Sequence, residues 1–255
     1  MEFWTLIPVG IVIATFASLV GIGGGLIWAP YLILVEKMQP ADAVMVSLII
    51  QIFGMGSANY SYIKRKMIYW KLTFGLLPFI AGGMILGSFL AQSIAKGNTI
   101  LLGLGIISMG TAILFAFRAD GYNEILNDDK NMKAPLGITL ASALFGTFSG
   151  MFSTGIGDFI IPLFRSKLKI PMQNAIGNSL FLNFSAALIG SAMHIFLKGH
   201  LNPILLWSIL FGGIGVLIGG QLGPIISQKI SEERLKEVFI FILMLIGLHM
   251  IYASL

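Results

Sequence analysis

The 255-residue sequence contains no cysteine and few charged residues. Without cysteine there is no disulfide, no thiolate nucleophile and no cysteine-bound metal. Only 11% of the residues are charged and the mean hydropathy is +0.91, whereas a soluble domain carries about 25% charged residues. Such a chain cannot cover its surface with solvated side chains. These scarcities exclude a soluble globular protein and predict one that lies in a lipid bilayer.

Other site signatures are missing as well. The three histidines, His194, His200 and His249, include no pair at the i, i+4 spacing that would place two metal ligands on one helical face. No Walker sequence is present, so ATP is not expected to drive transport directly. The net charge of +5 is attributed first to membrane topology. We therefore expect no metal, no cofactor and no nucleic-acid partner.

Long runs without Asp, Glu, Lys or Arg dominate what is present. A membrane-spanning helix needs about 20 such residues. Three ordinary spans are predicted in each half of the chain, and each half begins with a longer segment that glycines interrupt. The predicted spans are 42–63, 72–94, 98–117, 172–197, 203–227 and 235–253, and the interrupted segments are Phe3–Val35 and Pro135–Phe164.

The two interrupted segments belong to a duplication. The first reads Gly21-Ile22-Gly23-Gly24-Gly25 and continues to Pro30, and the second reads Gly155-Ile156-Gly157-Asp158 and continues to Pro162. At a constant offset of 132 residues, Gly23, Gly25 and Pro30 fall on Gly155, Gly157 and Pro162, and Ser47 falls on Ser179. Membrane helices broken at corresponding points of two halves are the best sequence pointer to a transporter's binding site.

The distribution of basic residues indicates how the second interrupted segment runs. If both segments crossed the membrane once, the sixteen Lys and Arg would divide 8 to 8 between its two sides. If both are hairpins that enter and return, the division is 13 to 3, as the positive-inside rule requires. No Lys or Arg precedes Lys37, so the first segment is not tested in this way, and the repeat supplies that inference.

The predicted fold is an all-α integral membrane protein with two inverted repeats. Each repeat is a glycine-broken re-entrant helical hairpin plus three transmembrane helices, because an odd number of crossings reverses the second half. The first repeat covers 1–117, a cytoplasmic linker covers 118–134, and the second repeat covers 135–255. Both termini are predicted to be extracytoplasmic. Two hairpin bends that meet near the middle of the membrane would bring helix ends and free N–H groups together, an arrangement that attracts anions.

The glycine-rich motif Gly21–Gly25 followed by Pro30, its looser repeat at Gly155–Pro162 and the duplication resemble the sulfite exporter TauE/SafE family, also described as 4-toluene sulfonate uptake permeases. The resemblance covers essentially the whole chain. It implies a secondary carrier, often an exporter, in the inner membrane of a prokaryotic cell. It also implies a small sulfur-containing anion as substrate: sulfite, a sulfonate, sulfoacetate or thiosulfate.

The second motif departs from the family pattern. It lacks the run of three glycines, and Asp158 stands where a glycine is expected. Apart from Asp42 and Glu237 near the ends of predicted spans, Asp158 is the only acidic residue inside a predicted membrane segment, and such residues usually mark ion or proton pathways. We therefore assign it a proton-coupling role. The alternative is a structural one, with Asp158 near the cytoplasmic mouth or paired with Arg165, two helical turns further on.

The predicted substrate site collects the glycines of both bends and the neutral polar residues near them. Amide and hydroxyl groups can hold an oxyanion without a full counter-charge, although such groups also commonly join membrane helices to one another. Asn178, Ser179, Asn183 and Ser185 follow the second bend, and the first three lie near one helical face. The predicted substrate-binding residues are Gly21, Gly23, Gly24, Gly25, Ser47, Gln51, Ser153, Thr154, Gly155, Gly157, Asn178 and Ser179.

Three functions therefore remain open at this stage, with a secondary anion carrier as the leading hypothesis. The second is an anion channel. The third is an intramembrane hydrolase with Ser179 as the nucleophile and His194 as the base, although Gly177-Asn178-Ser179-Leu180 lacks a second glycine after the serine. The sequence is silent on the anion transported, the direction of transport and the oligomeric state.

Overall fold

The computed structural model describes residues 2–93, 97–117, 131–198 and 202–255, and every regular element within them is a helix. A short 3₁₀ turn, η1, covers Phe3–Thr5. The α-helices are α1 (Leu6–Val20), α2 (Gly25–Leu34), α3 (Pro40–Lys64), α4 (Trp70–Ser93), α5 (Gly97–Phe117), α6 (Leu136–Phe152), α7 (Gly157–Leu168), α8 (Met172–Lys198), α9 (Pro203–Ser227) and α10 (Glu232–Ser254).

The prediction of an all-helical membrane protein is confirmed. Among the described residues, six helical segments are long and apolar enough to cross a bilayer: α3, α4, α8, α9, α10 and Phe3–Val20. The first five of these and α5 occupy the six predicted spans, and Phe3–Val20 is the first arm of the first interrupted segment. The second interrupted segment ends at Leu168 instead of Phe164. Most of the predicted linker, 118–130, lies outside the described residues.

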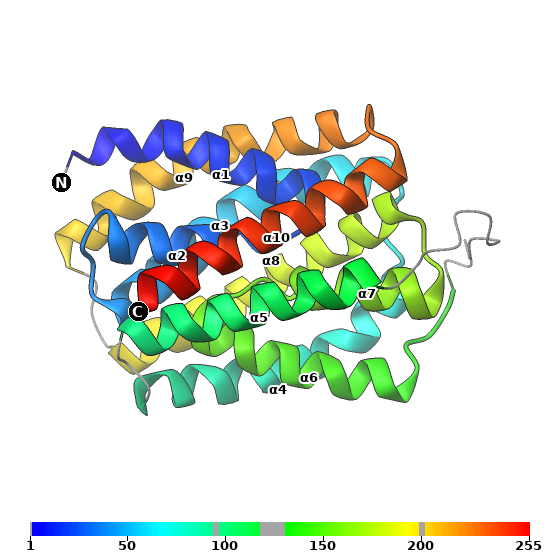
Figure 1. Cartoon of the computed structure of the whole chain (residues 1–255), viewed down its shortest axis with the longest axis horizontal. Coiled ribbons are helices and arrows are strands. Elements are labelled where there is room, and N and C mark those ends of the chain that lie inside the picture. The colour runs from blue at the N-terminus through cyan, green and yellow to red at the C-terminus, as the bar shows by residue number, and fades with distance from the viewer. Residues whose placement is uncertain (1, 94–96, 118–130, 199–201) are drawn as a thin grey trace.

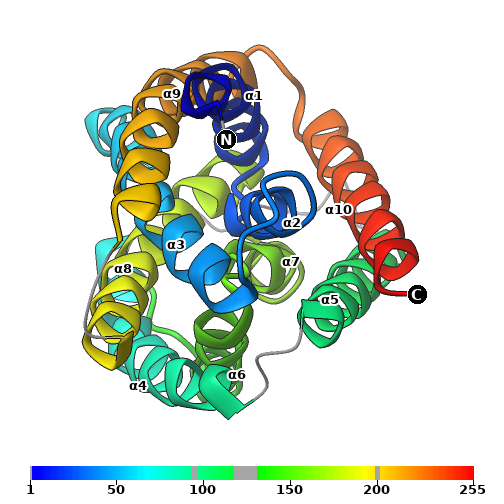
Figure 2. The ribbon, with the colours of Figure 1, turned by 90° about the vertical axis from the view of Figure 1, so that its left-hand side faces the viewer.

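The chain reverses direction at both glycine-rich bends. Figure 1 shows α1 running inward from the end of the bundle that carries both termini, and α2 returning to that end. The pair α6 and α7 enters and returns at the opposite end. Seen along the bundle, α2 and α7 lie near the centre, with the longer helices around them (Figure 2). The two bends therefore approach each other inside the bundle from opposite ends.

Left-handed backbone at one residue ends the first helix of each pair. Gly21, directly after α1, has φ 80°, a conformation that costs glycine little because it has no Cβ. Ser153, directly after α6, takes the same conformation with φ 58°, although it has a side chain. Non-glycine residues seldom adopt it without support from their surroundings. The offset of 132 relates these two residues, so both bends begin at equivalent positions.

Glycines allow the first arm of each hairpin to pack closely on a long helix of the other half. A Cβ built on Gly83 of α4 would lie 2.1 Å from the carbonyl oxygen of Ala143 in α6. A Cβ on Gly215 of α9 would lie 2.3 Å from the carbonyl oxygen of Ile7 in α1. Small residues at membrane-helix interfaces permit such backbone contact. The α1–α9 and α4–α6 pairs are the most extensive helix contacts described.

Most of the remaining contacts also join a helix of one half to a helix of the other half. Helix α3 packs on α9 while α8 packs on α4, and α3 also packs on α8. Helices α5 and α10 form a pair at one side of the bundle (Figure 2). This is the pattern of contacts that an inverted repeat would produce. The repeat itself remains a prediction from the sequence.

Candidate functional site

The two bends cross at Gly23 and Gly155. A Cβ built on Gly23 would lie 1.9 Å from the Cα of Gly155, and one built on Gly155 would lie 2.0 Å from the backbone nitrogen of Gly23. No side chain fits at either position without moving the backbone. The crossing therefore brings together two residues that the 132-residue offset relates, from opposite halves of the chain.

A long helix of the opposite half holds each bend. Ser179 Oγ in α8 donates to the Gly21 carbonyl at 2.9 Å, and Asn183 Nδ2 donates to the same oxygen at 3.5 Å. At the second bend, Ser153 Oγ is 2.7 Å from Ser47 Oγ and accepts from Gln51 Nε2 at 2.9 Å, both residues being on α3. The offset pairs Ser47 with Ser179 and Gln51 with Asn183, so corresponding side chains support both bends.

Side chains take up two of the N–H groups that the sequence predicts to be free for an anion. The Gly23 N–H donates to Asp158 Oδ1 at 3.1 Å, and the Gly157 N–H donates to Asn183 Oδ1 at 3.2 Å. In this structure these two N–H groups are therefore not free, and a role for Gly23 and Gly157 in substrate binding stays a prediction. The bends are packed together in this structure, and the protein supplies its own acceptors to both groups.

Asp158 is fully buried in the first turn of α7. Its second carboxyl oxygen, Oδ2, is buried and has no hydrogen-bond partner. Oδ2 therefore receives no hydrogen bond from Arg165, whose Nη1 donates to the Ile170 carbonyl at 3.4 Å. A carboxyl at the N-terminus of a helix is favourably placed in the helix dipole, but one backbone hydrogen bond compensates only part of the cost of burying a charge.

The structure also corrects the position that Asp158 occupies in the repeat. Helix α2 begins at Gly25 and helix α7 begins at Gly157, and the offset relates these two glycines. Asp158 therefore corresponds to Leu26, which is also buried, and not to a glycine. The counterpart of Thr154 is Ile22. At two positions, the second bend has a polar side chain where the first has an apolar one.

The other hydroxyls near the second bend have different roles. Ser149 Oγ donates to the Thr154 carbonyl, which the break leaves without a helical partner. Near the first bend, Ser18 Oγ donates to the Ala14 carbonyl at 2.6 Å. Both side chains thus satisfy backbone carbonyls. Thr154 differs, because its hydroxyl is buried and has no hydrogen-bond partner. Among the described residues, it shares this state with Asp158 Oδ2 and Asn59 Oδ1.

Asn178 is not at the bends. Its Oδ1 accepts from the Tyr69 N–H and from Thr73 Oγ1, each at 2.8 Å, so its side chain joins α8 to the start of α4. Asn183, which was not among the predicted substrate-binding residues, takes the central place instead, because it contacts both Gly157 and Gly21. The repeat offset carries the signal that identifies it, since Asn183 is the counterpart of Gln51.

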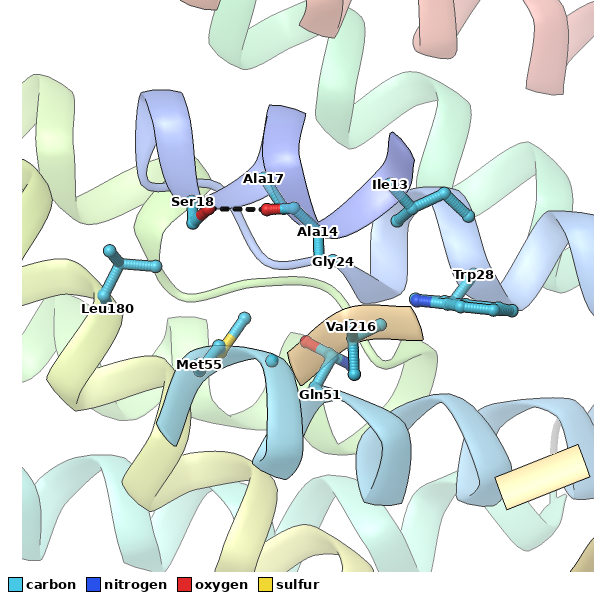
Figure 3. Close-up of a pocket in the computed structure, with 11 residues that line it drawn as sticks. Ile13, Ala14, Ala17, Ser18, Gly24, Trp28, Gln51, Met55, Leu180 and Val216 are labelled. Atoms are coloured by element: carbon cyan, nitrogen blue, oxygen red, sulfur yellow. Dashed lines mark hydrogen bonds between the residues drawn. The ribbon is translucent and has the colours of Figure 1, made fainter. Parts of the chain in front are cut away.

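A small cavity of about 20 Å³ lies beside the first bend. Figure 3 shows Gln51 and Trp28 at its edge and Ser18 bonded back to its own helix. The lining is mostly apolar, with Ala17, Met55, Leu180 and Val216 among the contributing residues. A cavity of this size holds about one water molecule. It is too small for an oxyanion.

The nucleophile and base of the hydrolase hypothesis do not meet. Ser179 Oγ donates to carbonyl oxygens of Gly21 and Ile176, and His194 Nε2 lies 3.0 Å from the carbonyl oxygen of Gly150. A serine nucleophile requires a base within hydrogen-bond reach. These two residues therefore do not form a catalytic pair. In the part of the chain that the structure describes, no group of three or more metal-ligating side chains occurs.

Comparison with known proteins adds an independent line of evidence. The family model described as "Sulfite exporter TauE/SafE" matches residues 6–250. A probable membrane transporter protein, YunE, of Bacillus subtilis is 26% identical, over 99% of this chain and 98% of its own length. One from Methanocaldococcus jannaschii is 27% identical over 98% and 97% of the two chains. No solved structure matches the chain significantly.

Proposed function

Because the chain belongs to the sulfite exporter TauE/SafE family of membrane transporters, we propose that it is a secondary carrier for a small sulfur-containing anion. The substrate class is sulfite, thiosulfate, a sulfonate or sulfoacetate. The carrier resides in the inner membrane of a prokaryotic cell. The family description favours export, and the absence of a Walker sequence favours transport driven by an ion gradient.

The observation that carries this proposal is the crossing of the two bends. The helices that follow them, α2 and α7, begin at Gly25 and Gly157, and a Cβ on Gly157 would lie 2.1 Å from the Gly21 carbonyl oxygen. Two helix N-termini thus start close together inside a bundle of membrane-spanning helices. Each N-terminus carries partial positive charge, which favours a bound anion, and the Gly23 and Gly157 N–H groups at the crossing now donate to side chains that an anion could replace. The anion binds here when the bends separate.

The inverted repeat supplies the means of alternating access. The repeats cover 1–117 and 135–255, with the cytoplasmic linker 118–134 between them. The exchange of helix contacts between halves supports this division, as does the position of both termini at one end of the bundle (Figure 1). In such carriers, one repeat rocks against the other around a fixed site. Each hairpin then closes one side of the membrane, and both termini are extracytoplasmic.

Asp158 couples transport to protons in this proposal. It is fully buried, it lies at the crossing, and its Oδ2 has no partner. Intramembrane acids of this kind commonly form proton pathways. The supporting polar residues at the crossing are Ser47, Gln51, Ser153, Thr154, Ser179 and Asn183. Asn178 has the weaker claim because its amide already joins α8 to α4.

Uptake into proteoliposomes tests the proposal. Purified protein should accumulate labelled sulfite, thiosulfate or a sulfonate, and a pH gradient should change the rate. Preloading the vesicles with unlabelled substrate separates a carrier from the channel alternative, because exchange accelerates entry only through a carrier. Absence of transport for every sulfur-containing anion would refute the substrate class. Transport without acceleration by preloaded substrate would favour the channel.

A further inference from the structure

We propose that Asp158 and the substrate anion compete for the same N–H group, so that the carrier binds the anion only together with one proton. This inference rests on the proposed anion-carrier function and adds the order and direction of coupling. In the structure, Asp158 Oδ1 already accepts from the Gly23 N–H at 3.1 Å. The carboxyl of the protein occupies the place that an oxyanion of the substrate would take at the crossing.

Two buried polar atoms without partners support a ligand at this bend. Asp158 Oδ2 and Thr154 Oγ1 are both buried and neither makes a hydrogen bond. Buried polar atoms are almost always paired, and an unpaired one costs about 1–3 kcal/mol. Both atoms belong to the second bend and the first turn of α7, where the first bend has Ile22 and Leu26. A bound oxyanion would give the Thr154 hydroxyl an acceptor.

Protonation of Asp158 changes what the crossing can bind. As a carboxylate, Asp158 has only acceptor atoms, and its negative charge would repel a second anion beside it. When a proton adds to Oδ2, the group becomes neutral and gains one O–H donor. The Gly23 N–H can then turn to the substrate, and the new O–H can donate to the same oxyanion. Anion and proton therefore bind together, and the carboxylate form of the carrier does not bind the anion.

Few other groups near this carboxyl can take up a proton. Within their described residues, α5 and α6 have no ionisable side chain, and α7 has only Arg165 and Lys167 besides Asp158. The Arg165 guanidinium does not deprotonate in proteins, so it cannot produce a pH dependence. His194 on α8 is buried against Gly150 and is the competing candidate. The remaining groups on the helices around the crossing are Tyr31 on α2, Asp42, Tyr60, Tyr62 and Lys64 on α3, and Lys198 on α8.

Joint binding fixes the direction in which a proton gradient acts. The proton and the anion cross in the same direction, so for a monovalent anion the cycle moves no net charge. An inward proton gradient then drives uptake of the anion. Export proceeds when the outward gradient of the anion exceeds the inward gradient of protons. The proposal therefore predicts symport and excludes an exchange of outgoing anion for incoming proton.

Binding of thiosulfate to the purified full-length protein tests this inference. Thiosulfate stays fully ionised around neutral pH, so the ligand itself takes up no proton. On the alkaline side of the titration of Asp158, the Kd of the wild type should rise about tenfold per pH unit, the slope for one linked proton. The Asp158→Asn variant should bind with a Kd that does not change with pH. The His194→Gln variant should keep the wild-type slope.

Calorimetry in two buffers of different ionisation enthalpy provides a check that needs no variant. On the alkaline side, wild-type protein should take up about one proton per thiosulfate bound. Binding without proton uptake, or an Asp158→Asn variant that keeps the slope, would overturn the inference and leave the anion carrier intact. Loss of the slope in His194→Gln would also overturn it. If neither thiosulfate nor a sulfonate binds at any pH, the proposed function fails as well.

Discussion

Alanine substitutions within the first bend should have different effects at directly adjacent positions. The affected positions are Gly23 and Gly25, and Gly24 between them is the matched control. A Cβ on Gly23 would lie 1.9 Å from the Gly155 Cα, and one on Gly25 would lie 1.8 Å from the Ser153 carbonyl oxygen. A Cβ on Gly24 has its nearest atom at 3.6 Å, the Gln51 Cγ, which is ordinary van der Waals contact.

The magnitude follows from these distances. Ordinary contact begins at 3.4 Å, so the backbone at Gly23 would have to move by about 1.5 Å. Overpacking of this kind costs about 1–3 kcal/mol. The same movement removes the hydrogen bond from the Gly23 N–H to Asp158, which adds about 1 kcal/mol or more. A loss of about 2–4 kcal/mol should lower the Tm by roughly 5 °C or more. Transport should fall with it, because the crossing is the proposed site.

Thermal unfolding in detergent and uptake into proteoliposomes measure both consequences. Gly23→Ala and Gly25→Ala should unfold at a lower temperature and transport poorly. Gly24→Ala should match the wild type, because its φ of −55° suits alanine. Gly82→Ala, with no atom within 4 Å, controls for the general effect of alanine in a membrane helix. Wild-type stability and transport in Gly23→Ala would refute the close crossing, and an equal loss in Gly24→Ala would refute the reasoning from distances.

Three further changes test other parts of the molecule. This cysteine-free chain allows single cysteines to be placed on either side of the membrane, as Lys133→Cys in the linker and Leu255→Cys at the C-terminus. In intact cells, an impermeant thiol reagent should label only Leu255→Cys. Labelling of Lys133→Cys from outside would contradict the predicted topology. Thr154→Val removes an unpartnered buried hydroxyl, so Tm should stay or rise while transport falls; unimpaired transport would remove Thr154 from the site. Asp42 and Lys198 form an ion pair between α3 and α8, so either Asp42→Lys or Lys198→Asp alone should lower the free energy of unfolding by about 1 kcal/mol or less. The double variant restores the pair with its charges exchanged and should recover most of the lost Tm.

The helices could be predicted from the sequence because the bilayer constrains them strongly. A run of about 20 uncharged residues has few alternatives to a spanning helix, since backbone polar groups in lipid must be satisfied internally. The bends could also be located, because glycine runs interrupt these segments at related positions. The structure places the breaks between Val20 and Gly25 and between Phe152 and Gly157, so the first lies within its motif and the second begins two residues before its motif. Only the ends differ, as at Leu168, where the second segment continues past Phe164.

The contacts at the bends were harder to predict. Asn178 and Asn183 lie five positions apart on α8, and the sequence places both near one helical face. Which of them faces the bend depends on the rotation of α8 about its axis, which packing against α3 and α4 determines. The hydrogen-bond partner of Asp158 was also hard to predict, because it depends on how the two halves pack together. A nearby basic residue, Arg165, is visible in the sequence, whereas the Gly23 N–H is 135 residues away and belongs to the backbone.

The site combines a nearly symmetric framework with asymmetric chemistry. The groups that hold the bends correspond in the two halves: Ser47 with Ser179 and Gln51 with Asn183. A symmetric framework explains how the two hairpins can exchange roles, but it offers no reason to bind a proton at one of them. That reason lies at Thr154 and Asp158, the two positions where the second bend is polar and the first is apolar. Both side chains keep a buried polar atom without a partner, which packing alone would not favour. In the carrier that we propose, the partners of these two atoms would be the anion and the proton that it moves, and their binding would offset this cost.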